Sequence, residues 1–171
     1  ELDDCRGVEQ PPNHHHWDVF NHMVETVGKL DDVLNVDTRA HDPLLAMAPT
    51  RDDFGTHLEG IVGDDQSRRT ILKLTGLLHD ISKPETKTVD DDGRVRFFGH
   101  ADDGALKARK MLLRLRCSRK VISRVSLMVR QHLRPGQISN NRAKPSNRAL
   151  FRYYDDLGNA AKDVVYLNMA D

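Results

Sequence analysis

The chain has 171 residues, of which 38% are hydrophobic and 30% are charged, and its 26 basic residues balance its 26 acidic ones. This length suffices for one well-packed domain but not clearly for two, and the composition is that of an ordinary, somewhat polar globular protein. No apolar run approaches the length of a membrane span and no signal peptide is visible at the start, so we expect no membrane partner.

The charges are distributed unevenly along the chain. Residues 105–154 contain fourteen Lys and Arg and no Asp or Glu, whereas residues 1–104 hold 22 of the 26 acidic residues. This segregation predicts an electropositive region that suits a phosphate-rich ligand or a nucleic acid. A solvated helical face that balances the acidic half of the same protein explains it equally well.

The two cysteines and the chain ends bear on compartment and domain organisation. Cys5 and Cys117 are far apart and form no CxxC motif, which is typical of a reducing compartment, so we predict a cytoplasmic protein with unpaired thiols. The sequence starts on Glu1 and stops at Asp171. We therefore expect one domain over residues 1–171, of a kind that is excised or trimmed from a longer chain.

The first half of the chain alternates helical and irregular patterns. WDVFNHMVETVGKL, residues 17–30, carries apolar residues at helical spacing, which predicts a helix. Residues 35–66 are weakly periodic and rich in Asp, Gly and Pro, so we expect an irregular stretch with at most a short helix. SRRTILKLTGLLHD, residues 67–80, resumes the helical pattern, with Ser67 or Asp65 as its cap and Pro84 as its end.

The second half is predicted to be helical after one hairpin. TKTVDDDGRVRFF, residues 86–98, has two short strand-like runs around Asp-Gly, which predicts a hairpin. Helices are expected over 101–116, 118–133, 146–157 and 159–171, with a loop over 134–145. The fold class expected from these elements is all-α with one small β-hairpin.

Histidine and aspartate recur at the predicted core edges of different helices. Imidazole and carboxylate together suit divalent transition metals or magnesium, and the set contains no thiolate. These residues are His22, His79, Asp80, His100, His132 and Asp171.

His79 and Asp80 close an apolar run, where an unpaired buried carboxylate is costly. Adjacent helix residues point about 100 degrees apart, so both side chains can converge on one ion beside the helix end. The carboxyl end of a helix also favours a cation. Lys83 follows one turn later and could hold a phosphate oxygen.

Each of these residues has a simpler explanation when it is taken alone. His79 and Asp80 could form a salt-bridged helix end, and His22 could be a partly buried core histidine. His100 could be an N-cap or a loop donor, and His132 could be a helix C-terminal residue that the dipole favours. Asp171 could simply be the chain end. The combination favours a metal site, while His41 and His57 are predicted to lie on the surface.

Four ordered segments carry a family resemblance. The pattern His, His-Asp, Asp on His22, His79-Asp80 and Asp171 resembles the HD superfamily of metal-dependent phosphohydrolases. More narrowly, the chain resembles the HD domain of bacterial tRNA nucleotidyltransferases and poly(A) polymerase-like proteins from about residue 7 to 171. The segments are HHHWDVFNH, LLHDISKPETKT, GRVRFFGHADDGA and VRQHLRP.

The resemblance implies an all-helical HD fold and one or two divalent ions per chain, with Mn, Ni, Co, Fe, Mg or Zn as candidates. The first ion is then held by His22, His79, Asp80 and Asp171. By the same resemblance, His100 and His132 hold a second ion, with Asp80 bridging, or serve as proton donors. Lys83 matches the family's phosphate-contacting lysine, and Arg134 is expected to assist it. The run 14–16 resembles a family feature of structural rather than ligating role.

The sequence departs from the family pattern in two places. Ser82 stands where the family usually has glycine, which should not disturb the metal. The nucleotidyltransferase head, with its glycine-rich turn and paired aspartates, is missing from these 171 residues. Asp90 and Asp92 have the spacing of such a pair, but their position beside Gly93 predicts an exposed turn. We therefore expect no nucleotide addition by this chain alone.

Two functions of different class follow from the resemblance. The first is a phosphohydrolase acting on a phosphomonoester or cyclic phosphodiester of a nucleotide or RNA 3′ end, by attack of metal-bound hydroxide on phosphorus. The second is an RNA-binding or structural half of a longer tRNA-processing protein with little hydrolysis, in which the basic segment contacts RNA. A nucleoside triphosphate or alarmone hydrolase shares the metal set but not the segment-level similarity.

Overall fold

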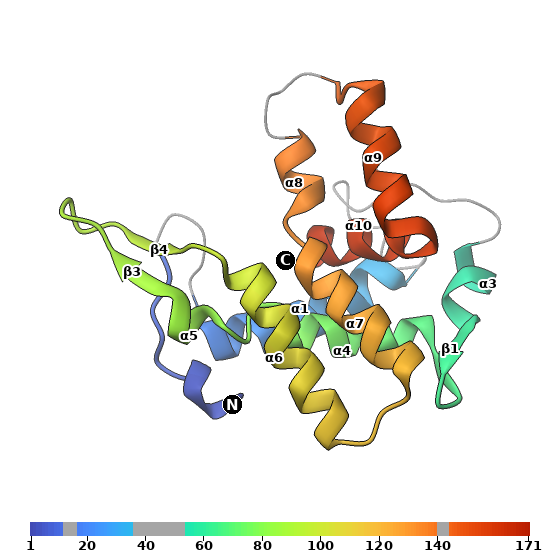
Figure 1. Ribbon diagram of the computed structural model, residues 1–171, viewed down its shortest axis with the longest axis horizontal. Coiled ribbons are helices and arrows are strands. Elements are labelled where there is room, and N and C mark those ends of the chain that lie inside the picture. The colour runs from blue at the N-terminus through green and yellow to red at the C-terminus, as the bar shows by residue number, and fades with distance from the viewer. Residues whose placement is uncertain (12–16, 36–53, 140–143) are drawn as a thin grey trace.

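The computed structural model describes residues 1–11, 17–35, 54–139 and 144–171. Within these ranges most of the chain is helical, and the strands form two small antiparallel hairpins (Figure 1). The expected all-α class is therefore confirmed. The expected hairpin is β3 (Lys87–Val89) with β4 (Val95–Phe97), and the second hairpin is β1 (Ile61–Gly63) with β2 (Gln66–Ser67).

Five helices build the core. They are α1 (Val19–Leu34), α4 (Arg68–Leu78), α6 (His100–Arg114), α7 (Arg119–Gln131) and α10 (Ala161–Ala170). α6 packs along α7, while α1 packs against both α4 and α10, and α4 also contacts α7. Their buried faces carry large apolar side chains at helical spacing, as the periodicity predicts. These include Met23, Leu30, Ile71, Leu72, Leu112, Ile122 and Leu167.

Short polar residues cap α1, α4 and α7, and Ser67 before α4 is the cap that the sequence predicts. The side chain of Asp18 accepts from the Asn21 amide before α1, and Ser67 accepts from the Thr70 amide before α4. Ser118 caps α7 in the same way through the amide of Val121. Each cap satisfies a backbone donor that the first helical turn leaves without a partner.

Two boundaries differ from the sequence prediction. α4 ends at Leu78, and Pro84 lies in the first turn of the short helix α5 (Lys83–Thr86) rather than stopping α4. The predicted loop over 134–145 begins with a helix, α8 (Arg134–Ser139). Proline is tolerated in a first helical turn, because the amides there have no intrahelical acceptor. In both cases the proline therefore starts a helix.

The remaining elements frame this core. They are the 3-10 turns η1 (Asp3–Cys5) and η3 (Gly158–Ala160) and the helices α3 (Phe54–Glu59) and α9 (Asn147–Leu157). α3 and the β1–β2 hairpin occupy part of the stretch that the sequence predicts as irregular. Among the described helices, none is long and apolar enough to cross a membrane.

Candidate metal centre

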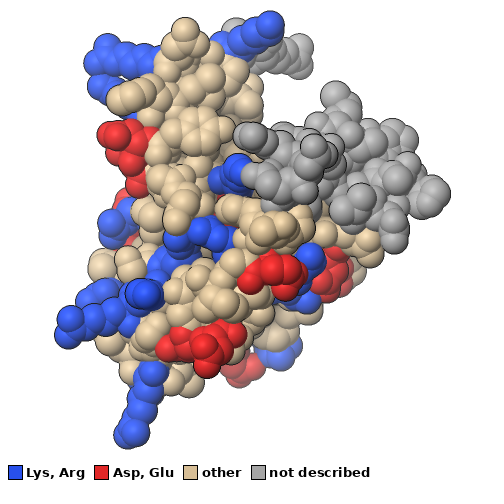
Figure 2. All heavy atoms as spheres, turned by 90° about the vertical axis from the view of Figure 1, so that its right-hand side faces the viewer, with Lys and Arg blue, Asp and Glu red and all other residues tan. Residues whose placement is uncertain are grey.

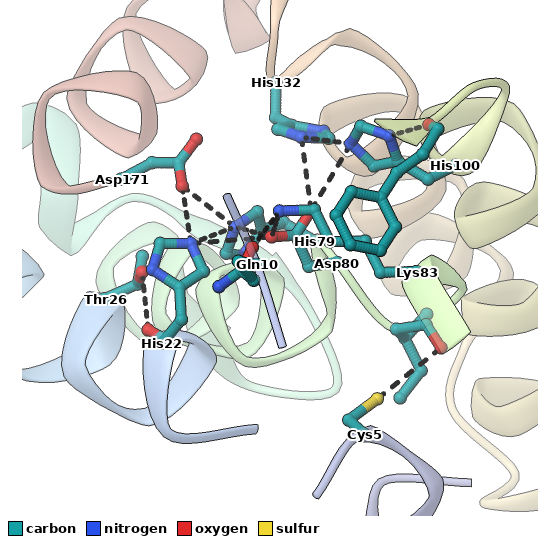
Figure 3. Close-up of polar contacts among 12 residues, drawn as sticks. Cys5, Gln10, His22, Thr26, His79, Asp80, Lys83, His100, His132 and Asp171 are labelled. Carbon is teal, nitrogen blue, oxygen red and sulfur yellow. Dashed lines mark hydrogen bonds and ion pairs between the residues drawn. The ribbon is translucent and has the colours of Figure 1, made fainter. Parts of the chain in front are cut away.

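The helix ends bring six side chains from five elements to one point in the core (Figure 3). α1 supplies its residue from within the helix, whereas α4, α7 and α10 supply residues just after their last turns and α6 supplies its first residue. The same six residues were predicted from the sequence. They are His22, His79, Asp80, His100, His132 and Asp171.

Four of these residues form one half of the cluster. The Nε2 atom of His22 lies 2.8 Å from Oδ1 of Asp171 and 3.3 Å from Nε2 of His79. Nε2 of His79 lies 3.1 Å from the same oxygen of Asp171 and 3.2 Å from Oδ2 of Asp80. His22, His79, Asp80 and Asp171 thus each offer a ligand atom within 4.8 Å of the others.

The other oxygen of Asp80 faces the second half of the cluster. Oδ1 lies 3.4 Å from Nε2 of His100 and 3.7 Å from Nε2 of His132. These two ring nitrogens are 3.3 Å apart. Because its two oxygens face different halves, Asp80 occupies the position that a bridging carboxylate would need between two ions.

Hydrogen bonds at the opposite ring nitrogen orient three of the imidazoles. Nδ1 lies 2.7–2.8 Å from the carbonyl oxygen three residues earlier in His79, His100 and His132. A carbonyl can only accept, so Nδ1 carries the proton and donates it. In the neutral ring, the Nε2 lone pair then points into the cluster, which is the arrangement found for metal-ligating histidines.

A bound cation fits the donor set. Both carboxylate oxygens of Asp80 are buried and accept no hydrogen bond from the described residues. The Lys83 ammonium lies 2.5 Å from Oδ2, close enough for an ion pair but without hydrogen-bond geometry. Nitrogen and oxygen lone pairs that face one another at about 3 Å repel unless a proton or a metal ion lies among them. The cluster could therefore hold a divalent metal.

The pKa values show that the cluster favours positive charge at its centre. Burial lowers the pKa of His79, but the carboxylates of Asp80 and Asp171 outweigh this effect and raise it to about 10. Burial raises the pKa of Asp80, but His79 and Lys83 hold it well below its usual range. Burial and the neighbouring His79 lower the pKa of His132 to about 4. The two carboxylates thus favour a positive charge beside His79, while the His132 ring stays neutral with its Nε2 lone pair free to bind a metal.

Lys83 and Arg134, the predicted phosphate-binding residues, occupy different positions. The Lys83 ammonium is buried beside Asp80 and donates to Oε1 of Gln10 at 2.6 Å. The Arg134 guanidinium lies 2.6 Å from a carboxylate oxygen of Asp156 and over the ring of Tyr153. Both residues line a cavity of about 630 Å³ beside the cluster. Lys83 thus belongs to the cluster and Arg134 to the cavity wall.

Sequence reasoning missed part of this cavity. Gln10 holds Lys83 in place from a segment with no recognisable motif, and Arg96 and Arg130 contribute ion-paired guanidinium groups to the cavity wall. The prediction that His57 is a surface residue is wrong, because its Nε2 lies 2.7 Å from the buried carboxylate of Asp163. His41 and the run 14–16 lie outside the described residues.

The fold and the His/Asp cluster define a family, and comparison with known proteins agrees. The HD domain profile matches residues 19–164, so the chain belongs to the HD domain family. The resemblance stated from the sequence is thereby confirmed. The matched range contains every residue of the cluster except Asp171.

Two curated relatives of the chain are both tRNA nucleotidyltransferases. The chain is 38% identical over 100 residues to the CC-adding tRNA nucleotidyltransferase of Thermus thermophilus, a match of 58% of this chain and 21% of the relative. It is 29% identical over 134 residues to the A-adding tRNA nucleotidyltransferase of Deinococcus radiodurans, covering 78% of this chain and 24% of the relative. The matches thus span about a fifth to a quarter of each relative's length.

Proposed function

We propose that the protein is a metal-dependent phosphohydrolase acting on a phosphomonoester or cyclic phosphodiester of a nucleotide or an RNA 3′ end. The observation that carries this proposal is the position of Asp80, whose two buried oxygens face two groups of metal-type ligands. When bound there, a divalent ion supplies Lewis-acid polarisation of a phosphoryl oxygen and lowers the pKa of a water molecule. The candidate metals are Mn, Ni, Co, Fe, Mg and Zn.

The residues take separate roles in this proposal. His22, His79, Asp80 and Asp171 hold the first ion, while His100 and His132 hold a second ion or donate a proton to the leaving group. Lys83 neutralises charge that develops on the phosphoryl oxygens, because its ammonium lies at the boundary between the cluster and the open cavity.

The cavity beside the cluster supports a nucleotide-sized substrate. At about 630 Å³ it lies within the range of small-molecule sites. Arg96, Arg130 and Arg134 line its wall, each paired with a carboxylate, and Phe97 and Phe98 supply aromatic surface. A phosphate near Lys83 could then leave an attached nucleoside in contact with these side chains.

The test is hydrolysis of 4-nitrophenyl phosphate, its bis ester and a 2′,3′-cyclic nucleotide by protein loaded with Mn²⁺ or Ni²⁺. We expect turnover that falls by at least about 100-fold in Lys83→Ala, the effect of losing one donor to the developing charge. Arg69→Ala removes a half-buried cation that does not line this cavity and should leave turnover unchanged. Metal-loaded protein that hydrolyses none of these compounds would contradict the proposal.

A second candidate rests on the relatives. Both are named tRNA nucleotidyltransferases, and the matched region is a minor part of each. The chain would then be an RNA-binding or structural HD half of such a protein, with little hydrolysis. Metal binding without turnover, together with RNA binding, would favour this candidate over the hydrolase.

A further inference from the structure

A second group of charged side chains lies where β1 meets the start of α7. Gly63 permits this close packing, because a Cβ there would lie 2.8 Å from the Ser118 hydroxyl and 3.2 Å from Cβ of Lys120. A cavity of about 510 Å³ opens beside this junction. It shares no residue with the metal cluster. Its polar lining comprises Arg68, Arg119, Lys120, Ser123, Arg124 and Asn159, and we call it the arginine cavity.

The charge beneath the arginine cavity is not balanced. One oxygen of the buried Asp163 carboxylate lies 2.8 Å from Nη1 of Arg68 and 3.8 Å from Nη1 of Arg124. Its other oxygen lies 2.7 Å from Nε2 of His57. A single carboxylate therefore serves two guanidinium groups, which leaves a net positive charge in a largely buried place.

Arg124 has a donor without an acceptor. Its Nη1 atom is buried and has no hydrogen-bond partner among the described residues, while Nη2 donates to the side-chain oxygen of Asn159. Burial, and then the nearby Arg68, lower the pKa of the Arg124 guanidinium. A buried donor of this kind is costly unless an acceptor occupies the space beside it.

The rim of the arginine cavity adds more positive charge. Arg119 and Lys120 are exposed in the first turn of α7, and no described carboxylate lies within ion-pair distance of either. Cations are disfavoured at a helix N-terminus, where the dipole favours anions. Lys and Arg side chains adjoin one another across the middle of this side of the molecule (Figure 2).

We propose that the arginine cavity binds a backbone phosphate of a nucleic acid strand. An oxyanion there would balance the positive charge that Asp163 leaves uncompensated. A polymer fits better than free phosphate, because exposed Arg119 and Lys120 extend the positive charge beyond the cavity itself. The exposed Ile61 on the cavity edge offers apolar surface for a sugar or base.

Phosphate binding at the arginine cavity is separate from the proposed hydrolysis, and it assigns a role to part of the basic segment of the sequence. Arg119, Lys120 and Arg124 come from the acid-free segment 105–154, and Arg68 comes from outside it. Arg109 and Lys110 lie in the same segment but are exposed on α6, away from the arginine cavity. The segment is thus divided into a part that binds phosphate and a part that is solvated.

The test compares two charge-reversal variants of equal charge change. Binding of a fluorescently labelled single-stranded RNA is followed by anisotropy for Arg119→Glu/Lys120→Glu and for Arg109→Glu/Lys110→Glu. We expect the first variant to bind at least about tenfold more weakly. Its plot of log affinity against log salt concentration should be shallower by roughly 0.7 for each phosphate that the variant no longer neutralises. The second variant should stay within about twofold of the unmodified protein.

A further variant separates this site from the metal centre. Arg124→Gln should weaken RNA binding while circular dichroism and the amount of bound Mn²⁺ remain unchanged. Equal weakening of RNA binding in the two charge-reversal variants would overturn the proposal. So would binding of inorganic phosphate, detected by calorimetry, in a protein that binds no RNA.

Discussion

The metal cluster and the arginine cavity each leave buried charge unbalanced, and the sign of that charge is negative in the cluster and positive in the cavity. In the cluster, two carboxylates and four imidazoles direct lone pairs at one another, so the ligand that suits them is a cation. In the cavity, two guanidinium groups share the carboxylate of Asp163, so the ligand that suits them is an anion. Natural cores rarely leave buried charges uncompensated. Two such places among the described residues therefore indicate two ligands.

The two regions also differ in how strictly they select a ligand. The cluster atoms come from five elements and are nearly all buried, with Asp80 only 1% exposed. That geometry suits small ions at fixed positions. The cavity is rimmed by exposed cations on flexible side chains, which suits a polyanion that is bound by charge more than by shape.

The largest effect should come from breaking the cluster. His79→Ala removes the imidazole that touches both carboxylates, so bound metal should be lost. Loss of a residue that only hydrogen-bonds to a metal ligand lowers activity roughly 10–100-fold. Loss of the ligand His79 itself should lower turnover by more than this. Elemental analysis and hydrolysis of 4-nitrophenyl phosphate measure both.

The next effect concerns the buried carboxylate of the arginine cavity. Asp163→Asn leaves Arg68 and Arg124 without a counter-charge, so the free energy of unfolding should fall by about 3–5 kcal/mol. Urea denaturation measures this change. Asp102→Asn is the control, because Asp102 pairs with Arg130 on the exposed surface and should contribute little. Equal stability of the two variants would mean that Asp163 does not compensate these guanidinium groups.

Metal removal should have a smaller effect on stability. A ligand that binds only the folded state stabilises it by about 2.7 kcal/mol at a concentration 100 times its Kd. Thermal melts of the metal-free protein should therefore shift upward on addition of Mn²⁺ or Ni²⁺. The Asp80→Ala variant should show no such shift. A similar shift in both proteins would place the stabilising ion outside the cluster.

The smallest effect is expected at Ser82, where the family usually has glycine. Its hydroxyl donates to the backbone oxygen of His100 at 2.6 Å, so Ser82→Ala should cost about 1 kcal/mol of stability. The metal content should not change, because neither atom is a ligand. Chemical denaturation and elemental analysis of the same sample check both points. Loss of metal in this variant would show that the hydroxyl helps to position His100.

Local patterns account for most of the fold and for the members of the cluster. Apolar periodicity located α1, α4, α6 and α7, and Ser67 was predicted as a cap of α4, because these features act within a few residues. His22 and Asp171 are 149 residues apart, and the sequence placed both in the set by their positions at predicted core edges and by the family resemblance. Their side chains meet because α1 packs against α10.

What the sequence could not supply depends on contacts between distant segments. His57 was assigned to the surface because its surroundings lack periodicity, yet it contacts Asp163 across 106 residues. Gln10 meets Lys83 in the same non-local way. The uneven charge was visible in the sequence, but only the packing of β1 on α7 shows which cations gather around one carboxylate.

The most direct test of the metal centre is elemental analysis of the purified, untagged protein beside its Asp80→Ala variant, each after dialysis against Mn²⁺ or Ni²⁺. The account predicts one or two equivalents of a divalent metal in the unmodified protein and none in the variant. Absence of metal from both, or equal metal in both, would contradict the claim that Asp80 lies at the centre of a metal site.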